Sequence, residues 1–226
     1  MSKDDAVLPL LTVAVATNNA GKIKEFHELL RDLPIEWVRV SDISGSSFSV
    51  VEDGETFQDN ALIKANAACR ITGYVALADD SGLEVDALAL RPGVRSARFA
   101  HDNATDAENN LALLAALAGI DKKSRTARFR CSLAVVSPFG DGPLLTAGTC
   151  EGRIGYEPRG SGGFGYDPLF LVDSLGDRTM AELTAEEKNQ VSHRGQAVRQ
   201  LRPMLLDLVE RLYVSVGCKR ARGSAP

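Results

Sequence analysis

Short apolar runs, separated by polar stretches rich in turn-forming residues, follow one another along this chain. Runs rich in Val, Leu, Ala and Phe predict strands, at about 11–16, 36–40, 75–79, 126–136, 144–153 and 168–172. Apolar residues spaced three and four apart predict helices, at about 21–32, 57–72, 105–118 and 195–214. Strands alternate with helices early and follow one another in the middle. We therefore expect an α/β domain with a mixed sheet.

Capping signals mark two helix starts. Thr105-x-x-Glu108 and Thr184-x-x-Glu187 both match the capping box, in which two side chains satisfy free backbone amides at the helix N-terminus. The second box predicts a short helical turn around Lys188, ahead of the last helix. Pro203 lies inside that last helix, where its missing N–H should kink or split it.

The composition is that of an ordinary globular protein: 226 residues, 44% apolar, 25% charged, with a formal charge of −4 at pH 7. No apolar run approaches the ~20 residues that span a bilayer, and the acidic N-terminus lacks the basic region of a signal peptide. The negative charge argues against binding to nucleic acid, so the basic run at 219–222 is interpreted as a solvated tail. We expect one domain over 1–226, with a core at about 11–214, a flexible tail at about 218–226, and no membrane or nucleic-acid partner.

Four cysteines, Cys69, Cys131, Cys150 and Cys218, lie far apart in the chain. Their spacing matches neither a metal motif nor a disulfide framework. Cys69 and Cys131 fall in apolar patterns and are expected in the core. These features predict a reduced, cytoplasmic protein.

A polar turn follows the first predicted strand and consists of Thr17, Asn18, Asn19, Ala20, Gly21 and Lys22. A strand, a tight turn and a helix N-terminus form a common anion site, because free amides and the helix dipole both favour negative charge. The loop is not a Walker A motif, since Ala16 and Ile23 replace its first Gly and its Ser or Thr. Taken alone, it fits a phosphate site and an ordinary strand–helix turn equally well.

Four acids, Glu52, Asp53, Glu55 and Asp59, precede the helix that carries Lys64. One or two of them could simply cap that helix. Mg2+ is usually bound in proteins through one or two carboxylates, together with water and phosphate oxygens. We favour a metal-ligand role for this cluster, with capping as the alternative.

The predicted strand at 75–79 ends in Asp79, Asp80, Ser81 and Gly82. Acids at the carboxyl end of a strand commonly face a ligand crevice. Because side chains alternate along a strand, we expect only one of the two carboxylates to face a site, while the other caps a turn or binds backbone. A plain Asp-Ser-Gly turn is the alternative.

The segment 157–170 combines glycines with aromatic residues and includes Phe164, Gly165, Tyr166 and Asp167. Glycine lets the backbone approach a flat ligand closely, and an aromatic ring can stack on a nucleobase. We favour a binding loop over a flexible surface loop.

Three basic residues, Lys188, His193 and Arg194, gather near the start of the last helix. A helix N-terminus is another place where an anion is favoured. Each residue alone would be interpreted as a solvated charge, so the group matters chiefly in combination with the other segments.

Six segments in this order resemble the inosine triphosphate pyrophosphatase family, the dITP/XTP pyrophosphatases: TNNAGK, VEDGETFQDNALIKA, ADDSGLEVDAL, PGVRSARFA, SGGFGYDPLF and AELTAEEKNQVSHRG. The resemblance covers about 11–212. One departure is Asn18, where the family often has Gly. Asn still permits a tight turn, because it tolerates positive φ better than most residues.

The resemblance implies roles for the matching residues. Asp80 matches the catalytic acid and, together with Glu52, the Mg2+ ligands. The implied nucleotide contacts are Thr17 to Lys22 for the phosphates, Lys64 and Ser81, Phe164 to Asp167 for the base, and Lys188, His193 and Arg194. Whether Arg95 and Arg98 touch the nucleotide or brace the cleft stays open.

The implied fold is an elongated mixed β-sheet with flanking helices and two lobes around a central cleft, usually dimeric. The implied reaction is Mg2+-dependent hydrolysis of ITP, dITP and XTP to the monophosphate and pyrophosphate. Such a reaction removes non-standard purine nucleotides before they enter DNA or RNA. The alternatives are a Maf-like pyrophosphatase acting on pyrimidine or modified nucleotides, and a nucleotide-binding regulator without turnover.

Overall fold

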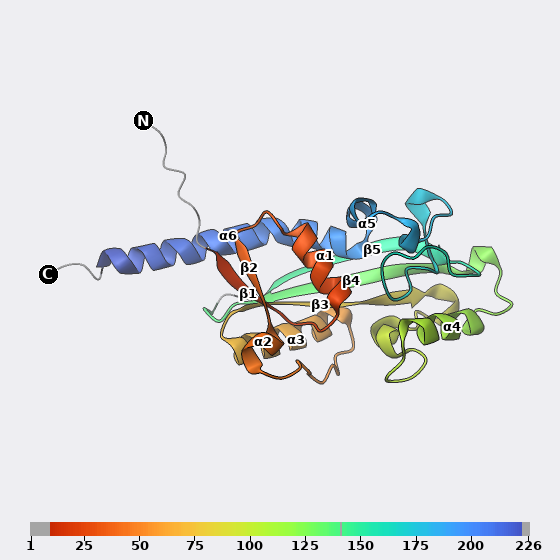
Figure 1. Ribbon diagram of the computed structural model, residues 1–226, viewed down its shortest axis with the longest axis horizontal. Helices are drawn as coiled ribbons and strands as arrows, with labels where there is room; N and C mark the ends of the chain where they lie inside the picture. Colours follow the sequence, from red (N-terminus) through yellow and green to blue (C-terminus); the bar gives the residue numbers. More distant parts are fainter. Residues whose placement is uncertain (1–9, 141, 223–226) are drawn as a thin grey trace, which may run out of the picture.

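The computed structural model describes residues 10–140 and 142–222, with side chains as far as residue 213. The molecule is elongated, and its long strands run along the long axis (Figure 1). The strands are β1 (Leu11–Val15), β2 (Ile35–Arg39), β3 (Val75–Val85), β4 (Thr126–Val136), β5 (Leu144–Ile154) and β6 (Phe170–Val172). The helices are α1 (Ala20–Leu29), α2 (Val40–Ser44), α3 (Phe57–Thr72), α4 (Asp106–Ala116), α5 (Ala185–Val191) and α6 (His193–Arg222). Short 3-10 helices include η2 (Gly93–Arg98).

The six strands form one mixed sheet in the order β2-β1-β3-β4-β5-β6. β1 is parallel to both β2 and β3, whereas β3, β4, β5 and β6 pair in antiparallel fashion. This order follows from the connections: helices join the parallel strands, and the turn after β4 joins two long antiparallel ones. The predicted α/β fold with a mixed sheet is confirmed.

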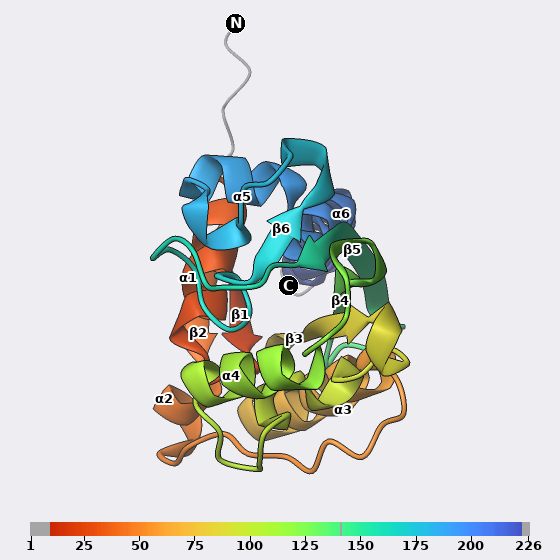
Figure 2. The same cartoon turned by 90° about the vertical axis from the view of Figure 1, so that its right-hand side faces the viewer.

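The two faces of the sheet bury different kinds of side chain. Alternation along β1 sends Val13 and Val15 to the face covered by α1 and α6, and Ala14 to the face covered by α3. α3 presents alanines of its own to that second face, so that small residues meet small residues and the helix lies close to the sheet. Viewed along the long axis, the sheet lies between α1, α5 and α6 on one side and α3 and α4 on the other (Figure 2).

A separate core surrounds the beginning of β4 and the end of β5. Leu113 of α4 and Leu117, the C-cap of that helix, pack there with Phe129 and Phe170, whose ring centroids lie 4.5 Å apart. The separate cores form two lobes, as the resemblance implied, and a cavity is lined by Phe129 and Tyr166 of this core and by Ala16 and Phe48 of the core beneath α3.

One strand differs from the prediction in a way that affects the site. β3 continues to Val85, so Asp79 and Asp80 lie within the strand and not at its end. β3 pairs with β1 only as far as Leu77, whereas Asp80 pairs with Ser132 of β4. The acids therefore lie just beyond the carboxyl end of β1. The two acids were expected at the end of their own strand, next to a crevice. The cavity does lie at the end of a strand, but that strand is β1.

The last helix also differs from the prediction. α6 is continuous from His193 to Arg222, so Pro203 does not split it. Leu201 and Leu205, on either side of the proline, are both buried in the core against the sheet and hold the helix there. The helical backbone extends over 218–222, part of the range expected to form a tail, and 223–226 lie outside the described residues, so the flexibility of the tail stays a prediction. In the described part of the chain, no helix is both long and apolar enough to cross a bilayer.

Several local predictions are confirmed. Both capping boxes form, at Thr105 and at Thr184, and the second opens the short helix that carries Lys188. Cys69 and Cys131 are buried, as is Cys150. The single-turn helix α2 was not predicted, because five residues carry no apolar period that could reveal it.

Candidate active site

The loop between β1 and α1 is held by its own side chains. Asn19 caps α1, its Oδ1 accepting from the Lys22 amide over 3.1 Å, and the Asn19 amide donates to Thr17 Oγ1 over 3.1 Å. Asn18 Nδ2 donates to Phe48 O over 2.6 Å, which ties the loop to the segment ahead of α3. The amides of Asn19 and Lys22, expected to face a ligand, are thus bonded within the loop, because Asn and Thr side chains readily accept from nearby amides.

Asp79 and Asp80 point to opposite faces of β3, as alternation requires. Asp79 is completely buried; it forms an ion pair with Lys22, and its Oδ2 accepts from Arg194 Nε over 2.9 Å. Burial alone would raise the pKa of Asp79, but Arg194 and Lys22 lower that pKa well below its usual value. Asp79 therefore anchors two cations, instead of capping a turn as expected.

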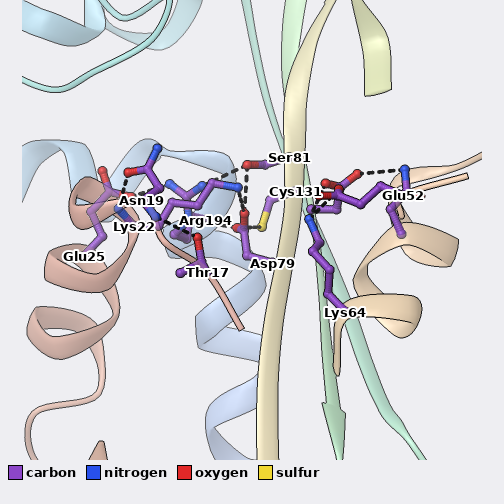
Figure 3. A network of polar contacts seen from close by, with 12 residues as sticks. Thr17, Asn19, Lys22, Glu25, Glu52, Lys64, Asp79, Ser81, Cys131 and Arg194 are labelled. Atoms are coloured by element: carbon purple, nitrogen blue, oxygen red, sulfur yellow. Dashed lines mark hydrogen bonds and ion pairs between the residues drawn. The ribbon is translucent and has the colours of Figure 1, made fainter. Parts of the chain in front are cut away.

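Asp80 lies on the other side of β3, next to α3 and the acidic segment before it. Lys64 Nζ lies 2.7 Å from Asp80 Oδ1 and 2.9 Å from Glu52 Oε2, so the ammonium bridges the two carboxylates. Figure 3 shows Glu52 and Lys64 on one side of the strand and the Lys22–Asp79–Arg194 group on the other. Burial raises the pKa of Asp80 to about 6, although Lys64 opposes the shift.

The other acids ahead of α3 have different positions. Asp59 forms a capping box with Thr56 at the start of α3, while Asp53 and Glu55 are exposed. The capping interpretation is thus confirmed for Asp59, whereas the metal-ligand role of this segment stays a prediction. In the described part of the chain, no three His, Cys, Asp or Glu side chains converge as a ready metal cluster. The carboxylates of Glu52 and Asp80 both contact Lys64 Nζ and therefore lie close to each other. Two hard oxygen donors side by side fit Mg2+ when phosphate oxygens and water complete its shell.

The glycine-rich loop, residues 160–167, is folded back on itself by Asp167. Asp167 Oδ2 accepts from the Phe164 amide over 3.0 Å and lies 2.7 Å from Lys188 Nζ. The Tyr166 hydroxyl donates to Ser96 O over 2.8 Å, and the side chain is buried. Tyr166 thus joins the loop to η2, which leaves Phe164 as the ring available for stacking.

Glu25 joins the two cations that follow the glycine-rich loop. Its Oε1 lies 2.8 Å from Lys188 Nζ, and its Oε2 forms an ion pair with Arg194. Arg194 also donates from Nη2 to Ser81 Oγ over 2.9 Å. Sequence reasoning missed Glu25. Its position one helical turn beyond Gly21 and Lys22 was the available signal, because residues three and four apart share a helix face.

His193 is buried against the ring of Phe129, with the ring centroids 4.8 Å apart and the planes 16° from parallel. Burial, and then the charge of Arg194, lower the pKa of His193 well below its usual value, so the imidazole is neutral. Its Nδ1 is buried without a hydrogen-bond partner among the described residues.

One cavity of about 430 Å3 brings nearly all the predicted site residues together. Ala20 and Gly21 do not line it, whereas Arg98 does, and Arg95 lies outside with its side chain 67% exposed. The predicted residues that do line it are Thr17, Asn18, Asn19, Lys22, Glu52, Lys64, Asp80, Ser81, Phe164, Gly165, Tyr166, Asp167, Lys188, His193 and Arg194. Asp106 and Asn109 of α4 also line the cavity and were not predicted, because the polar start of α4 was interpreted only as a cap.

Comparison with known proteins identifies the family. The model of the Ham1 family matches residues 13–204. The chain belongs to the Ham1 family. A Ham1-family relative from Desulforamulus reducens, a dITP/XTP pyrophosphatase, is 49% identical over 205 residues, which cover 90% of this chain and 98% of the relative. The dITP/XTP pyrophosphatase of Coxiella burnetii is 47% identical over 199 residues, covering 88% and 98%.

Solved Ham1-family structures share the fold. The structure of a HAM1 protein from Coxiella burnetii superposes with a TM-score of 0.78 at 46% identity, covering 88% of this chain and all of the other. A nucleoside-triphosphatase (dITP/XTP pyrophosphatase) from Mycobacterium abscessus superposes with a TM-score of 0.68 at 43% identity, covering 86% and 100%. The family resemblance seen in the six sequence segments is confirmed.

Proposed function

We propose that this Ham1-family chain hydrolyses ITP, dITP and XTP to the nucleoside monophosphate and pyrophosphate. The observation that carries the proposal is that one cavity joins the loop 17–22, the Asp80–Glu52 pair and the glycine-rich loop 160–167. A nucleoside triphosphate has three matching parts: a polyanionic tail, a scissile anhydride and a flat base. The names of the relatives point to the same substrates.

Mg2+ would be held by Asp80 and Glu52. When bound, it supplies positive charge that neutralises phosphate oxygens. The charges of the site support this need. Glu52 and Asp80 share a single cation, Lys64, so this pair of carboxylates exceeds its partner by one negative charge. Phosphate oxygens placed beside the pair would therefore meet net negative charge unless a further cation accompanied them.

Asp80 is the proposed catalytic carboxylate, and it acts as a general base. Its carboxylate lines the cavity and, among the described residues, receives one weak hydrogen bond besides the Lys64 contact, from Asn60 Nδ2 over 3.4 Å. It can therefore orient a water molecule for attack on the α-phosphorus and take its proton. Lys22, Lys64 and Lys188 would stabilise charge on the departing pyrophosphate, with Thr17 to Asn19 and Ser81 contacting the nucleotide. No covalent intermediate is needed, since Ser81 donates only to Asp79 among the described residues, and the low pKa of that carboxyl makes it a poor base for activating the hydroxyl.

Recognition of the base is assigned to His193, Arg194 and the residues Phe164 to Asp167. Phe164 offers a ring at the cavity. The neutral His193 offers a buried ring nitrogen that no described residue occupies. Hypoxanthine and guanine both carry O6, so guanine is rejected only if its 2-amino group is left without a partner. An unpaired buried donor costs about 1–3 kcal/mol.

Pyrophosphate release from ITP, dITP, XTP, GTP and ATP, with and without Mg2+, tests the proposal. We expect Mg2+-dependent turnover of the first three by wild type and its loss in Asp80→Asn, with Asp53→Asn as the exposed control. Turnover of pyrimidine or modified nucleotides instead would favour the Maf-like alternative. Binding without any turnover would favour the regulator. A homodimer, a cytoplasmic location and the absence of nucleic-acid binding stay predictions.

A further inference from the structure

Helix α4 binds both backbone polar groups of Gly165, at the centre of the segment Phe164–Asp167. The Gly165 amide donates to Asp106 Oδ2 over 2.7 Å, and the Gly165 carbonyl accepts from Asn110 Nδ2 over 2.8 Å. Asp106 and Asn110 are four residues apart and so share one face of the helix. Asn110 Nδ2 also donates to Asp106 O over 2.8 Å, which fixes its amide group in place.

The same helix also holds η2, whose residues Ser96 and Ala97 form a further wall of the cavity. Asn109 is buried; its Oδ1 accepts from the Ala100 amide over 2.9 Å, and its Nδ2 donates to Ala97 O over 3.1 Å. The Tyr166 hydroxyl reaches Ser96 O in the same wall. α4 therefore sets the separation between the glycine-rich loop and η2, the two segments that border this end of the cavity.

Gly165 needs such support because of its conformation. Its φ is +62°, a left-handed value that glycine adopts at little cost but does not hold by itself. Its neighbours have opposite tasks, because Phe164 lines the cavity and Tyr166 is anchored to η2. A rotation of the Gly165 peptide would move the Phe164 ring and the nearby amides together.

The geometry points to Asp106 and Asn110 as positioning residues for base recognition, acting through the Gly165 peptide. This inference rests on the proposed function. We call the hydrogen bonds from Asp106 and Asn110 to the Gly165 peptide the clamp. When the clamp is intact, the segment Phe164–Asp167 is ordered before the nucleotide arrives. When the clamp is lost, only a fraction of molecules has the binding-competent loop, and apparent affinity falls by that fraction.

Steady-state kinetics with ITP and GTP, and hydrogen–deuterium exchange over residues 160–167, test the inference. Asp106→Ala and Asn110→Ala should raise KM for ITP about tenfold, change kcat less than about twofold, and reduce the preference for ITP over GTP. The Gly165 amide should exchange faster in both variants. Asp106→Asn keeps a side-chain oxygen at the same place and should restore KM to within about twofold of wild type.

Glu108→Ala is the matched control. It removes the capping-box partner of Thr105 and so weakens the same turn of α4, but its side chain does not contact Gly165. If Glu108→Ala raises KM and speeds exchange as much as Asn110→Ala does, helix stability explains the effect and the inference is overturned. Unchanged KM and exchange in Asn110→Ala would also overturn it. Absence of ITP turnover in wild type would instead overturn the proposed function, while the exchange data would still decide whether the clamp exists.

Discussion

The Nζ atom of Lys188 in α5 lies 2.8 Å from Oε1 of Glu25 in α1, and this contact joins the two helices. Glu25 also pairs with Arg194, and Arg194 pairs with Asp79. The cations proposed to contact the nucleotide are thus held in place by carboxylates (Figure 3). Holding charges in advance avoids reorganisation when the substrate binds, which is the usual origin of electrostatic catalysis.

Glu25→Gln should lower the free energy of unfolding by about 3 kcal/mol, because it removes one of the two carboxylates that pair with each of the buried cations Lys188 and Arg194. Urea denaturation at pH 7 measures the change. Glu28→Gln on the same helix is the control, since Glu28 meets the exposed Lys24 only at 4.0 Å, and such a pair contributes about 0–1 kcal/mol. Equal losses in the two variants would show that the buried ion pairs do not stabilise the fold.

His193 should make stability fall as the solution is acidified below pH 6.5. Burial and Arg194 depress the pKa of His193 in the folded state, so below the usual value of about 6.5 the unfolded chain binds a proton that the folded chain does not. The loss can reach about 1.4 kcal/mol per pH unit for one group. Asp80 acts with the opposite sign, because burial raises its folded-state pKa to about 6.

A comparison of wild type with His193→Gln removes the contribution of Asp80, which is common to both. We expect the stability advantage of wild type, measured by urea denaturation, to shrink steadily from pH 7 to pH 5. His101→Gln, at an exposed position, serves as the control. A pH-independent difference for His193→Gln would mean that His193 takes up a proton without penalty in the folded protein.

Gly21→Ala should impair nucleotide binding more than it alters stability. A Cβ at this position would lie 2.6 Å from Cδ1 of Phe164, so the ring must shift from its present position at the cavity. Alanine favours a helix over glycine by about 1 kcal/mol, which offsets part of the strain. We expect KM for ITP to rise several-fold while the thermal midpoint changes little. Gly142→Ala, where a Cβ meets nothing within 4 Å, should leave both unchanged.

Glu52→Gln should raise the Mg2+ concentration required for half-maximal turnover of ITP. The substitution removes one of the two carboxylates that converge on Lys64 and leaves the shape of the side chain intact. Titration of activity with MgCl2 at saturating ITP measures the shift. Glu55→Gln provides an exposed acid from the same segment. An identical Mg2+ dependence in wild type and Glu52→Gln would remove Glu52 from the proposed metal site.

Local signals predicted most of the architecture. Apolar periodicity located the six strands and the main helices, and the capping boxes at Thr105 and Thr184 located helix starts. The extent of β3 was underestimated because Asp79, Asp80, Ser81 and Gly82 are poor strand formers when considered locally. Pairing with β4 along ten consecutive positions overrides that preference, since each backbone group finds a partner.

The order of the six segments, and the residue types within them, were sufficient to indicate the family and to name many of the residues that line the cavity. The sequence alone did not show which partner each charge takes. Arg194 contacts Asp79, which lies 115 positions away in the sequence, and Glu25, which lies 169 positions away. Asp106 and Gly165 are in contact across 59 positions. Such contacts depend on how whole helices pack on the sheet, because an error of one turn or one register step redirects every side chain. The sequence by itself therefore shows which chemical groups the site contains, whereas only the tertiary structure decides which of these groups contact one another.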